Sequence, residues 1–436
     1  MMEMAVIAAF AAVLMSCVAL DVSVVYALTA GYLIFFFYGL KKGCSVKSLF
    51  KASLSGMKTV KNILFIFLLI GMITALWRAA GTIPVIICCS AKLVRPSAFV
   101  LLTFLLNCVV SVLTGTAFGT AATMGVICMS MAAAMGADPV FVGGAVVSGI
   151  FFGDRCSPVS TSALLVSELT GTDLYGNIRR MVRTAAIPFL MTCAVYLVLG
   201  MFSGGKGEIM DVQAVFSESF RLHWILLLPA FLVLVLAIFR VRVKTTLLVS
   251  IVTASFFCLM IQKIPAAEFF KLLVHGYRSE DPQTAAMING GGILSMVRVA
   301  LIVGISSSYA GIFERTGLLL GMKRHILSLS RKITPFGSIM TVAAGASMIA
   351  CNQTLAIMLT DQLCRDTEPD KEKFAVHLEN TVVVMAPLVP WSIAGSVPVA
   401  TIGGTAMCLA FACYLYLLPA WNFAAEAVKR HSLGKS

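Results

Sequence analysis

Long apolar runs separated by short polar or charged stretches fill the whole chain. Most runs approach the ~20 residues that a helix needs to cross about 30 Å of hydrocarbon. This pattern predicts an all-α polytopic membrane protein, with its connections confined to the two bilayer surfaces. The runs expected to span are Met4–Leu20, Val22–Leu40, Asn62–Leu76, Ala98–Leu113, Thr184–Phe202, Leu222–Phe239, Leu247–Ile261, Val297–Phe313 and Val399–Leu418.

One further apolar run is interrupted partway. Val140–Phe152 is followed by the polar stretch Gly153–Ser162 before apolar residues return at Ala163. Irregular backbone at membrane depth is tolerated only where protein buries it or where it lines a wet cavity. In transporters such interruptions form the ion and substrate site near the bilayer midplane. We therefore expect a broken helix here, with a site beside it.

Three other apolar runs contain similar interruptions. Polar or helix-breaking residues interrupt apolar runs at Thr114–Thr120, Ala350–Thr354 and Ala386–Ser392. For the first of these, a small-residue face for tight helix packing explains the pattern equally well. The run Gly81–Val94 is too short to span directly, so it predicts a tilted or re-entrant, hairpin-like segment.

The breaks recur in the same order in two halves of the chain. Gly119 and Gly153 are 34 residues apart, and Asn352 and Pro387 are 35 residues apart. Lysines at 41–61 precede the first span of one half, whereas the basic cluster 323–332 follows the corresponding span of the other. Since positive charge marks the cytoplasmic side, opposite placement predicts two inverted structural repeats.

These features divide the chain into five parts. We expect N-terminal spans and a cytoplasmic connection in 1–60, a first transport repeat in 61–202, a connecting segment with two spans in 203–296, a second transport repeat in 297–420 and a cytoplasmic tail in 421–436.

The amino-acid composition also indicates an integral membrane protein. Charged residues make up 12% of the chain, against roughly 25% in soluble domains, and the mean hydropathy is +0.95. The net charge of +13 does not indicate nucleic-acid binding, because the cations lie at span ends without a basic aromatic face. The start of the chain carries Glu3 and lacks a basic signal-peptide region. We therefore expect a multi-pass protein of the inner (plasma) membrane.

Other function classes find little support. The thirteen cysteines show no C-x-x-C spacing, so packing is a better explanation than a metal or disulfide framework. The chain has neither a P-loop nor hydrolytic machinery, so we expect no enzyme, no catalytic residues and no cofactor. The expected partners are the lipid bilayer and a small ion or solute, without nucleic acid. A homodimer remains an open alternative.

Asp154 is the carboxylate best placed to take part in ion binding, because it lies at the interrupted helix. A lone charge at mid-membrane costs at least ~2.5–3.5 kcal/mol, which a bound cation, a proton or a partner offsets. Asp154 is interpreted first as a direct ion ligand, and a structural salt bridge with Arg155 or another arginine is a close alternative. No resident metal is expected beyond a transported Na⁺ near Asp154.

Oxygen-bearing side chains surround the four breaks, and such ligands suit a hard cation such as Na⁺. The alternative is that their hydroxyls bond to their own helices. The further candidate ion- or substrate-binding residues are Ser157, Ser160, Thr161, Thr116, Asn352, Thr354, Asn380, Thr381, Trp391 and Ser392. Ser162 and Gln353 offer similar groups. Trp391 could wall a pocket or simply pack.

Two more titratable residues could carry protons. Glu379 and His377 lie on the segment that leads to the second-half interruption. Because His377 follows a charged turn, we expect it at a wet surface.

The motifs Phe152–Ser160, Gly171–Leu174 and Pro387–Trp391 together resemble the NhaC family of Na⁺/H⁺ antiporters, within the ion transporter superfamily. The resemblance runs from about Lys61 to Leu418 and implies exchange of Na⁺ for H⁺ by alternating access, with Na⁺ and/or H⁺ as coupling ions. Relatives in the superfamily exchange organic acids or move amino acids.

Two positions depart from the family pattern. Where the family typically has Asp-Thr-Thr after Ser-Pro-x-Ser, this chain has Thr161-Ser162-Ala163. Where it often has Glu-Asp, this chain has Glu379-Asn380. Fewer fixed negative charges make room for a zwitterionic or anionic solute. Two alternatives to Na⁺/H⁺ exchange are therefore kept: a Na⁺- or H⁺-coupled carrier of an amino acid or small organic acid, and a channel or scaffold without coupled transport.

Overall fold

The computed structural model describes residues 2–20, 22–91, 96–203, 212–239, 241–316, 334–350 and 352–433. Within these ranges the regular elements are helices. Seven of the described helices are long and apolar enough to cross a membrane, or up to nine elements if two bent helix pairs each count as one span. The predicted all-α polytopic membrane protein is confirmed.

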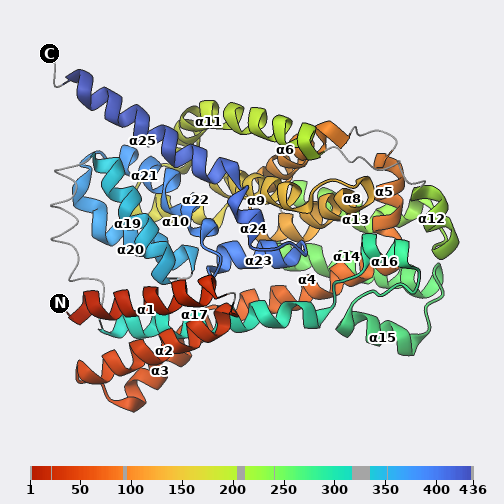
Figure 1. Ribbon diagram of the computed structural model, residues 1–436, viewed down its shortest axis with the longest axis horizontal. Helices are drawn as coiled ribbons and strands as arrows, with labels where there is room; N and C mark the ends of the chain where they lie inside the picture. Colours follow the sequence, from red (N-terminus) through yellow and green to blue (C-terminus); the bar gives the residue numbers. More distant parts are fainter. Residues whose placement is uncertain are drawn as a thin grey trace.

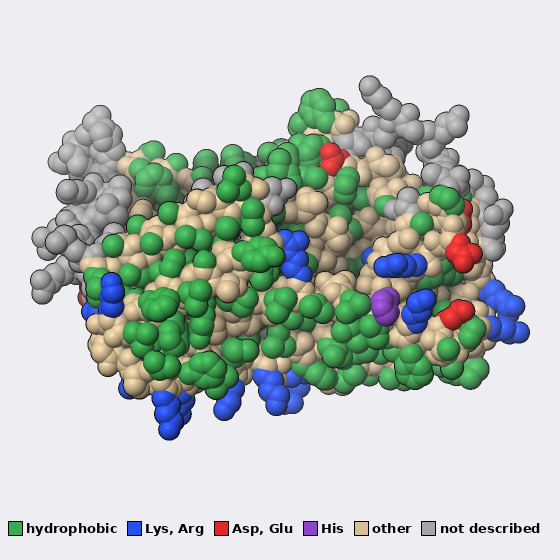
Figure 2. Space-filling view, turned by 60° about the horizontal axis from the view of Figure 1, so that its bottom comes forward, with side chains coloured by type: hydrophobic (Ala, Val, Ile, Leu, Met, Phe, Trp, Pro, Cys, Tyr) green, Lys and Arg blue, Asp and Glu red, His purple; other side chains and the backbone are tan. Residues whose placement is uncertain are grey.

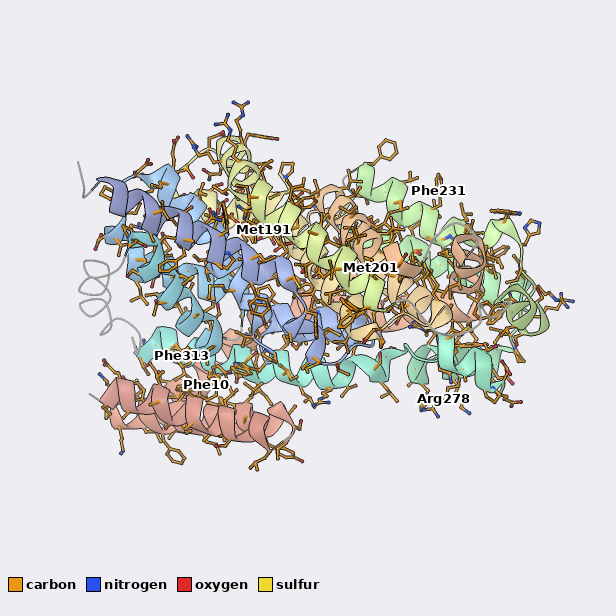
Figure 3. The ribbon with its side chains drawn as sticks, turned by 45° about the horizontal axis from the view of Figure 1, so that its top comes forward. Phe10, Met191, Met201, Phe231, Arg278 and Phe313 are labelled. Carbon is orange, nitrogen blue, oxygen red and sulfur yellow. The ribbon has the colours of Figure 1, made fainter. Side chains whose placement is uncertain are left out.

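A helical layer lies along one side of the molecule (Figure 1). It consists of α1 (Met2–Ala19), α2 (Val24–Lys41), α3 (Val46–Thr59) and the later α17 (Val297–Thr316). Aromatic rings hold it together: Phe10 and Phe313 lie between α17 and the N-terminal pair (Figure 3), and the rings of Phe35 and Phe313 meet edge-on with centroids 4.5 Å apart. The lysine-rich stretch, expected as a plain connection, contains the helix α3.

The first half begins with a bent pair. Helix α4 (Lys61–Ala79) and α5 (Thr82–Ala91) meet at Gly81, which has φ +86°, and the apolar parts of the pair are bent by 62°. This matches the tilted or re-entrant segment expected here. The half continues with α6 (Pro96–Thr114), α7 (Ala117–Thr120), a π-helical turn (Ala121–Gly125), α8 (Val126–Met135), α9 (Pro139–Cys156), α10 (Thr161–Thr170) and α11 (Leu174–Ser203).

The connecting segment, expected to hold two spans, has two apolar helical stretches. Val243–Met260 is long and apolar enough to cross a membrane, and Trp224–Leu236 is shorter. The elements of the segment are α12 (Val212–Ser219), α13 (Leu228–Ile238), α14 (Val243–Met260), α15 (Ala266–His275) and α16 (Pro282–Ile288).

The second half repeats the broken-helix plan. Its elements are α19 (Pro335–Ala350), α20 (Gln353–Cys364), α21 (Lys371–Asn380), α22 (Val382–Met385), a 3₁₀ turn (Ala386–Leu388), α23 (Ile393–Thr401), α24 (Met407–Ala410) and α25 (Cys413–Leu433). The segments on either side of Val389–Ser392 are bent by 55°.

The last predicted span was wrong. Val399–Leu418 is not one helix, because α23 ends at Thr401 and the chain turns through Gly403, whose φ of +70° ordinary residues rarely adopt. The last apolar helical segment is instead Met407–Val428. Helix α25 runs on to Leu433, so most of the expected tail is helical.

The four breaks come in two matching pairs. Thr116 (φ −145°, ψ 123°) and Asn352 (φ −142°, ψ 127°) each cap the helix that follows the first break of a half. Ser160 (φ −69°, ψ 135°) and Ser392 (φ −72°, ψ 144°) do the same after the second break. The halves thus share backbone geometry. Their opposite orientation stays a prediction, and the basic cluster 323–332 lies outside the described residues.

The outer surface suits lipid. Figure 2 shows a face with many apolar side chains; some lysines and arginines lie along its lower edge, and others lie at its right-hand end beside acidic side chains and a histidine. Large apolar residues are exposed on the outer helices, including Met191 and Met201 of α11 and Phe231 of α13, which Figure 3 labels. Inside, α6 and α9 pack closely and form the centre of the broken-helix region.

Gly149 makes this close packing testable. A Cβ there would lie 2.6 Å from Cβ of Asn107 and 2.7 Å from the Phe104 carbonyl oxygen, whereas one at Gly304 of α17 would meet nothing within 4 Å. We expect Gly149→Ala to destabilise the protein by about 1–3 kcal/mol through overpacking, and Gly304→Ala to be neutral or slightly stabilising. Melting temperatures of the purified variants in detergent test this; equal values would contradict the α6–α9 contact.

Candidate functional site

The second break of the first half lies at Ser157–Ser160. Gly153, Asp154 and Arg155, expected within the interruption, instead form the last turn of α9, and the Ser157 N–H still donates to the Gly153 carbonyl at 2.9 Å. The break therefore starts four residues later than predicted. Gly153 remains helical because it packs directly against Ser111 of α6, where a larger residue would not fit.

Asp154 is 5% exposed and receives hydrogen bonds from both halves of the chain. Its Oδ2 accepts from the Ser162 hydroxyl at 2.9 Å and from Gln353 Nε2 at 3.5 Å, and its Oδ1 accepts from the Ser160 hydroxyl at 3.4 Å. Ala117, at the start of α7, lines the same cavity beside this carboxylate. Three helix starts, those of α7, α10 and α20, thus meet at one carboxylate.

Arg155 makes a different set of contacts from Asp154. Its guanidinium is fully buried and donates to Asn380 Oδ1, to the Met181 carbonyl at 3.1 Å, to Tyr414 Oη at 3.2 Å and to Thr184 Oγ1 at 3.3 Å. Within the described residues, Asp154 and Arg155 form no salt bridge. Of the two alternatives left by the sequence for Asp154, the structure therefore does not show the pairing with Arg155.

Glu379 adds a second buried carboxylate. It is 1% exposed, and it lies close enough to Arg155 and Asp154 to interact electrostatically with both. Its Oε2 has no hydrogen-bond partner among the residues that the structure describes. Two acids and one guanidinium therefore share this buried region, and one acid oxygen is left available.

A cavity of about 540 Å³ opens beside Asp154. Both first breaks line it, through Thr116 of one half and Asn352 of the other. Since these residues cap α7 and α20, the starts of both helices face the cavity. The predicted candidates that line it are Asp154, Thr161, Thr116, Asn352 and Thr354; Gln353 and Arg242 line it as well.

The remaining hydroxyl and amide candidates have structural partners. The Ser157 hydroxyl donates to the Val112 carbonyl at 2.7 Å, and the Thr381 hydroxyl donates to the His377 carbonyl of its own helix at 2.7 Å. Ser160 and Ser392 cap α10 and α23, and Asn380 holds Arg155. These residues shape the breaks without lining the cavity.

Two side chains differ from their expected surroundings. Trp391 does not line the cavity; its Nε1 donates to the Met348 carbonyl at 2.9 Å and its ring packs in the apolar cluster beside the N-terminal layer. His377, expected at a wet surface, is 7% exposed and packs edge-on against Phe336. The turn that precedes it is polar, but α10, α11, α19 and α25 pack around its helix.

Two contacts were not anticipated from the sequence. Tyr414 reaches Arg155 across 259 positions of sequence, and no local pattern marks that distance. Arg242 was interpreted only as part of a basic span end, yet it lines the cavity. Both arise from tertiary packing.

The comparisons with known proteins agree with this architecture. The family model described as the Na⁺/H⁺ antiporter family matches residues 1–167 and 149–420. The Na⁺/H⁺ antiporter NhaC of Alkalihalophilus pseudofirmus is 29% identical over 383 residues, covering 84% of this chain and 82% of the relative. The malate-2H⁺/Na⁺-lactate antiporter of Bacillus subtilis is 26% identical, with coverages of 88% and 84%.

A third relative is the arginine/ornithine antiporter ArcD of Halobacterium salinarum, 27% identical over 76% of this chain and 71% of its own. The family match covers nearly all of the chain, including both halves and all four breaks. The resemblance drawn from the sequence motifs is confirmed: the chain belongs to the Na⁺/H⁺ antiporter family.

Proposed function

We propose that this antiporter exchanges Na⁺ for H⁺ at the Asp154 carboxylate, which the two ions occupy alternately. The observation that carries the proposal is the position of Asp154, a buried acid on the wall of a cavity built from breaks in both halves. Membership in an antiporter family argues against the alternative of a channel or scaffold without coupled transport.

The charges of the buried cluster favour one cation at a time. Asp154 and Glu379 contribute two negative charges when ionised, and Arg155 contributes one positive charge. An uncompensated charge inside the membrane is costly. The cluster is therefore most stable when one Na⁺ or one H⁺ supplies the missing positive charge, and that exclusive choice is what an exchanger requires.

Hydroxyl groups allow the same site to accept either ion. Ser162 donates one hydrogen bond to Asp154 Oδ2, and Ser160 and Ser162 bond to each other at 2.8 Å. A hydroxyl rotates freely, so it can donate to the carboxylate or offer an oxygen lone pair to a cation. In the proposed Na⁺ state these oxygens turn toward the ion, and Thr161 supplies a further oxygen from the cavity wall.

A second candidate is a coupled carrier of a small organic acid or amino acid. The cavity of about 540 Å³ is much larger than a Na⁺ ion needs, and the starts of α7 and α20 face it together with Arg242. Helix N-termini and arginine attract carboxylates. Two relatives are named for transport of such solutes, malate and lactate in one case and arginine and ornithine in the other.

Asp154→Asn tests the exchange site. We expect Na⁺-dependent collapse of a pH gradient in proteoliposomes to fall to the level of empty vesicles, because the amide cannot bind a proton or balance a cation. Asp173→Asn is a matched control, since Asp173 is exposed and asparagine caps a helix equally well. A folded Asp154→Asn protein with normal exchange would remove Asp154 from the site.

Competition between the ions gives a pH prediction. If Na⁺ and H⁺ occupy one carboxylate, protonation as the pH falls removes the Na⁺ form, so the apparent KM for Na⁺ should rise by up to about tenfold per pH unit. The maximal rate at saturating Na⁺ should change much less. Initial exchange rates over a grid of pH and Na⁺ concentration measure this, and a constant KM with a falling maximal rate would indicate separate ion sites.

Labelled solutes test the second candidate. Vesicles with imposed Na⁺ or H⁺ gradients should accumulate malate, lactate, arginine or ornithine if the cavity carries an organic solute. Uptake that requires a gradient and is lost in Asp154→Asn would support the carrier. Exchange of Na⁺ for H⁺ without added solute, and no gradient-driven uptake of any of the four, would reject it.

A further inference from the structure

A second cluster of potential ligands lies away from the Asp154 cavity. Glu368 precedes α21, His377 lies on α21 and Glu426 lies on α25. One carboxylate oxygen from each glutamate and one ring nitrogen of the histidine all lie within 4.8 Å of one another. None of the three lines the cavity beside Asp154, and neither the family match nor the relatives' names refer to them.

The cluster is enclosed, and part of its bonding capacity is unused. His377 is 7% exposed and Glu368 is 9% exposed, while the Glu426 side chain is 18% exposed. Among the described residues, His377 Nδ1 and Glu426 Oε2 are buried and have no hydrogen-bond partner. A buried polar atom without a partner costs about 1–3 kcal/mol, so a ligand that engages these atoms would recover that cost.

Lys373 shows that the cluster attracts positive charge. Its Nζ lies 2.6 Å from a Glu368 oxygen and 3.7 Å from a Glu426 oxygen. The lysine side chain is 48% exposed, so it can swing toward water while the two glutamates stay in place. Its ammonium group lies beyond hydrogen-bond distance of Glu426, and His377 Nδ1 has no partner among the described residues, so the lysine leaves part of the cluster's bonding capacity unused.

We propose that Glu368, His377 and Glu426 bind a divalent transition-metal ion such as Zn²⁺, which displaces the Lys373 ammonium. One imidazole nitrogen and two carboxylate oxygens form a common ligand set for such ions, with water completing the coordination. A divalent cation neutralises the charges of both glutamates, whereas the Lys373 ammonium neutralises only one.

Metal binding would join two helices that also hold Arg155. His377 lies three residues before Asn380 on α21, and α25 carries both Glu426 and Tyr414. Asn380 and Tyr414 each accept a hydrogen bond from Arg155. A bound ion would therefore fix α21 against α25 and stiffen the group of helices that Arg155 already connects, from outside the exchange cavity.

Co²⁺ is a suitable probe, because its visible absorption reports coordination and because cysteine ligation adds intense thiolate bands in the near ultraviolet. The full-length protein in detergent at pH 7.5, freed of metal by a chelator, is titrated with Co²⁺. We expect saturable binding without thiolate bands, weakened at least about tenfold in His377→Asn and Glu426→Gln through loss of a ligand. The exposed Glu268→Gln serves as a control and should bind normally.

Lys373→Met tests the proposal in the opposite direction, because it should increase the affinity for Co²⁺, and a misfolded protein would not bind the ion more tightly. Removing the competing ammonium should tighten Co²⁺ binding on the order of tenfold, because the like charge opposing the ion is gone. Unchanged affinity in His377→Asn, Glu426→Gln and Lys373→Met, or binding carried entirely by thiolate ligands, would overturn the proposal. The assay needs no transport, so its result is independent of the exchange mechanism at Asp154.

Discussion

A helix that stops inside a bilayer must provide a partner for each backbone group that it frees, because the surrounding hydrocarbon offers none. This constraint explains the organisation of the chain. Thr116, Ser160, Asn352 and Ser392 each occupy an extended position and use a side-chain oxygen to bond the N–H groups of the helix that follows. The remaining polar capacity of the breaks faces protein or the cavity. The site therefore lies where the chain can least tolerate unpaired groups.

Much of the architecture could be predicted from the pattern of apolar runs and from the prolines and capping residues that interrupt them. Pro96 and Pro335 open the helices before the first breaks, and Pro158 and Pro390 each lie two residues before a capping serine. Such signals are local, so the sequence reveals them. The prediction of one span over Val399–Leu418 was wrong because a continuous hydrophobic run does not show where the chain turns. The turn occurs at Gly403-Gly404, and apolar residues on both sides of this pair conceal it.

The site was predictable only in part, because its geometry depends on which face of a helix each side chain occupies. Asp154 and Arg155 are adjacent in sequence, yet successive residues on a helix point in different directions, and the two make entirely different contacts. Trp391 and Thr381 belong to the same motif region as Ser392 but face packing partners. Where the family often has a second acid, Asn380 presents an amide oxygen to Arg155, so the charge balance of the cluster differs from the one that the family pattern implies.

The hydrogen bonds of Arg155 have a mechanical consequence. One guanidinium connects the end of α9 to α11 through Met181 and Thr184, to α21 through Asn380 and to α25 through Tyr414. Sliding α11, α21 or α25 past α9 would leave at least one buried guanidinium N–H group without its partner. When the transporter changes the side on which its cavity opens, these four helices should move together as one rigid block. The relative movement should occur at surfaces where aromatic rings pack against one another, such as the contact between α17 and the first two helices.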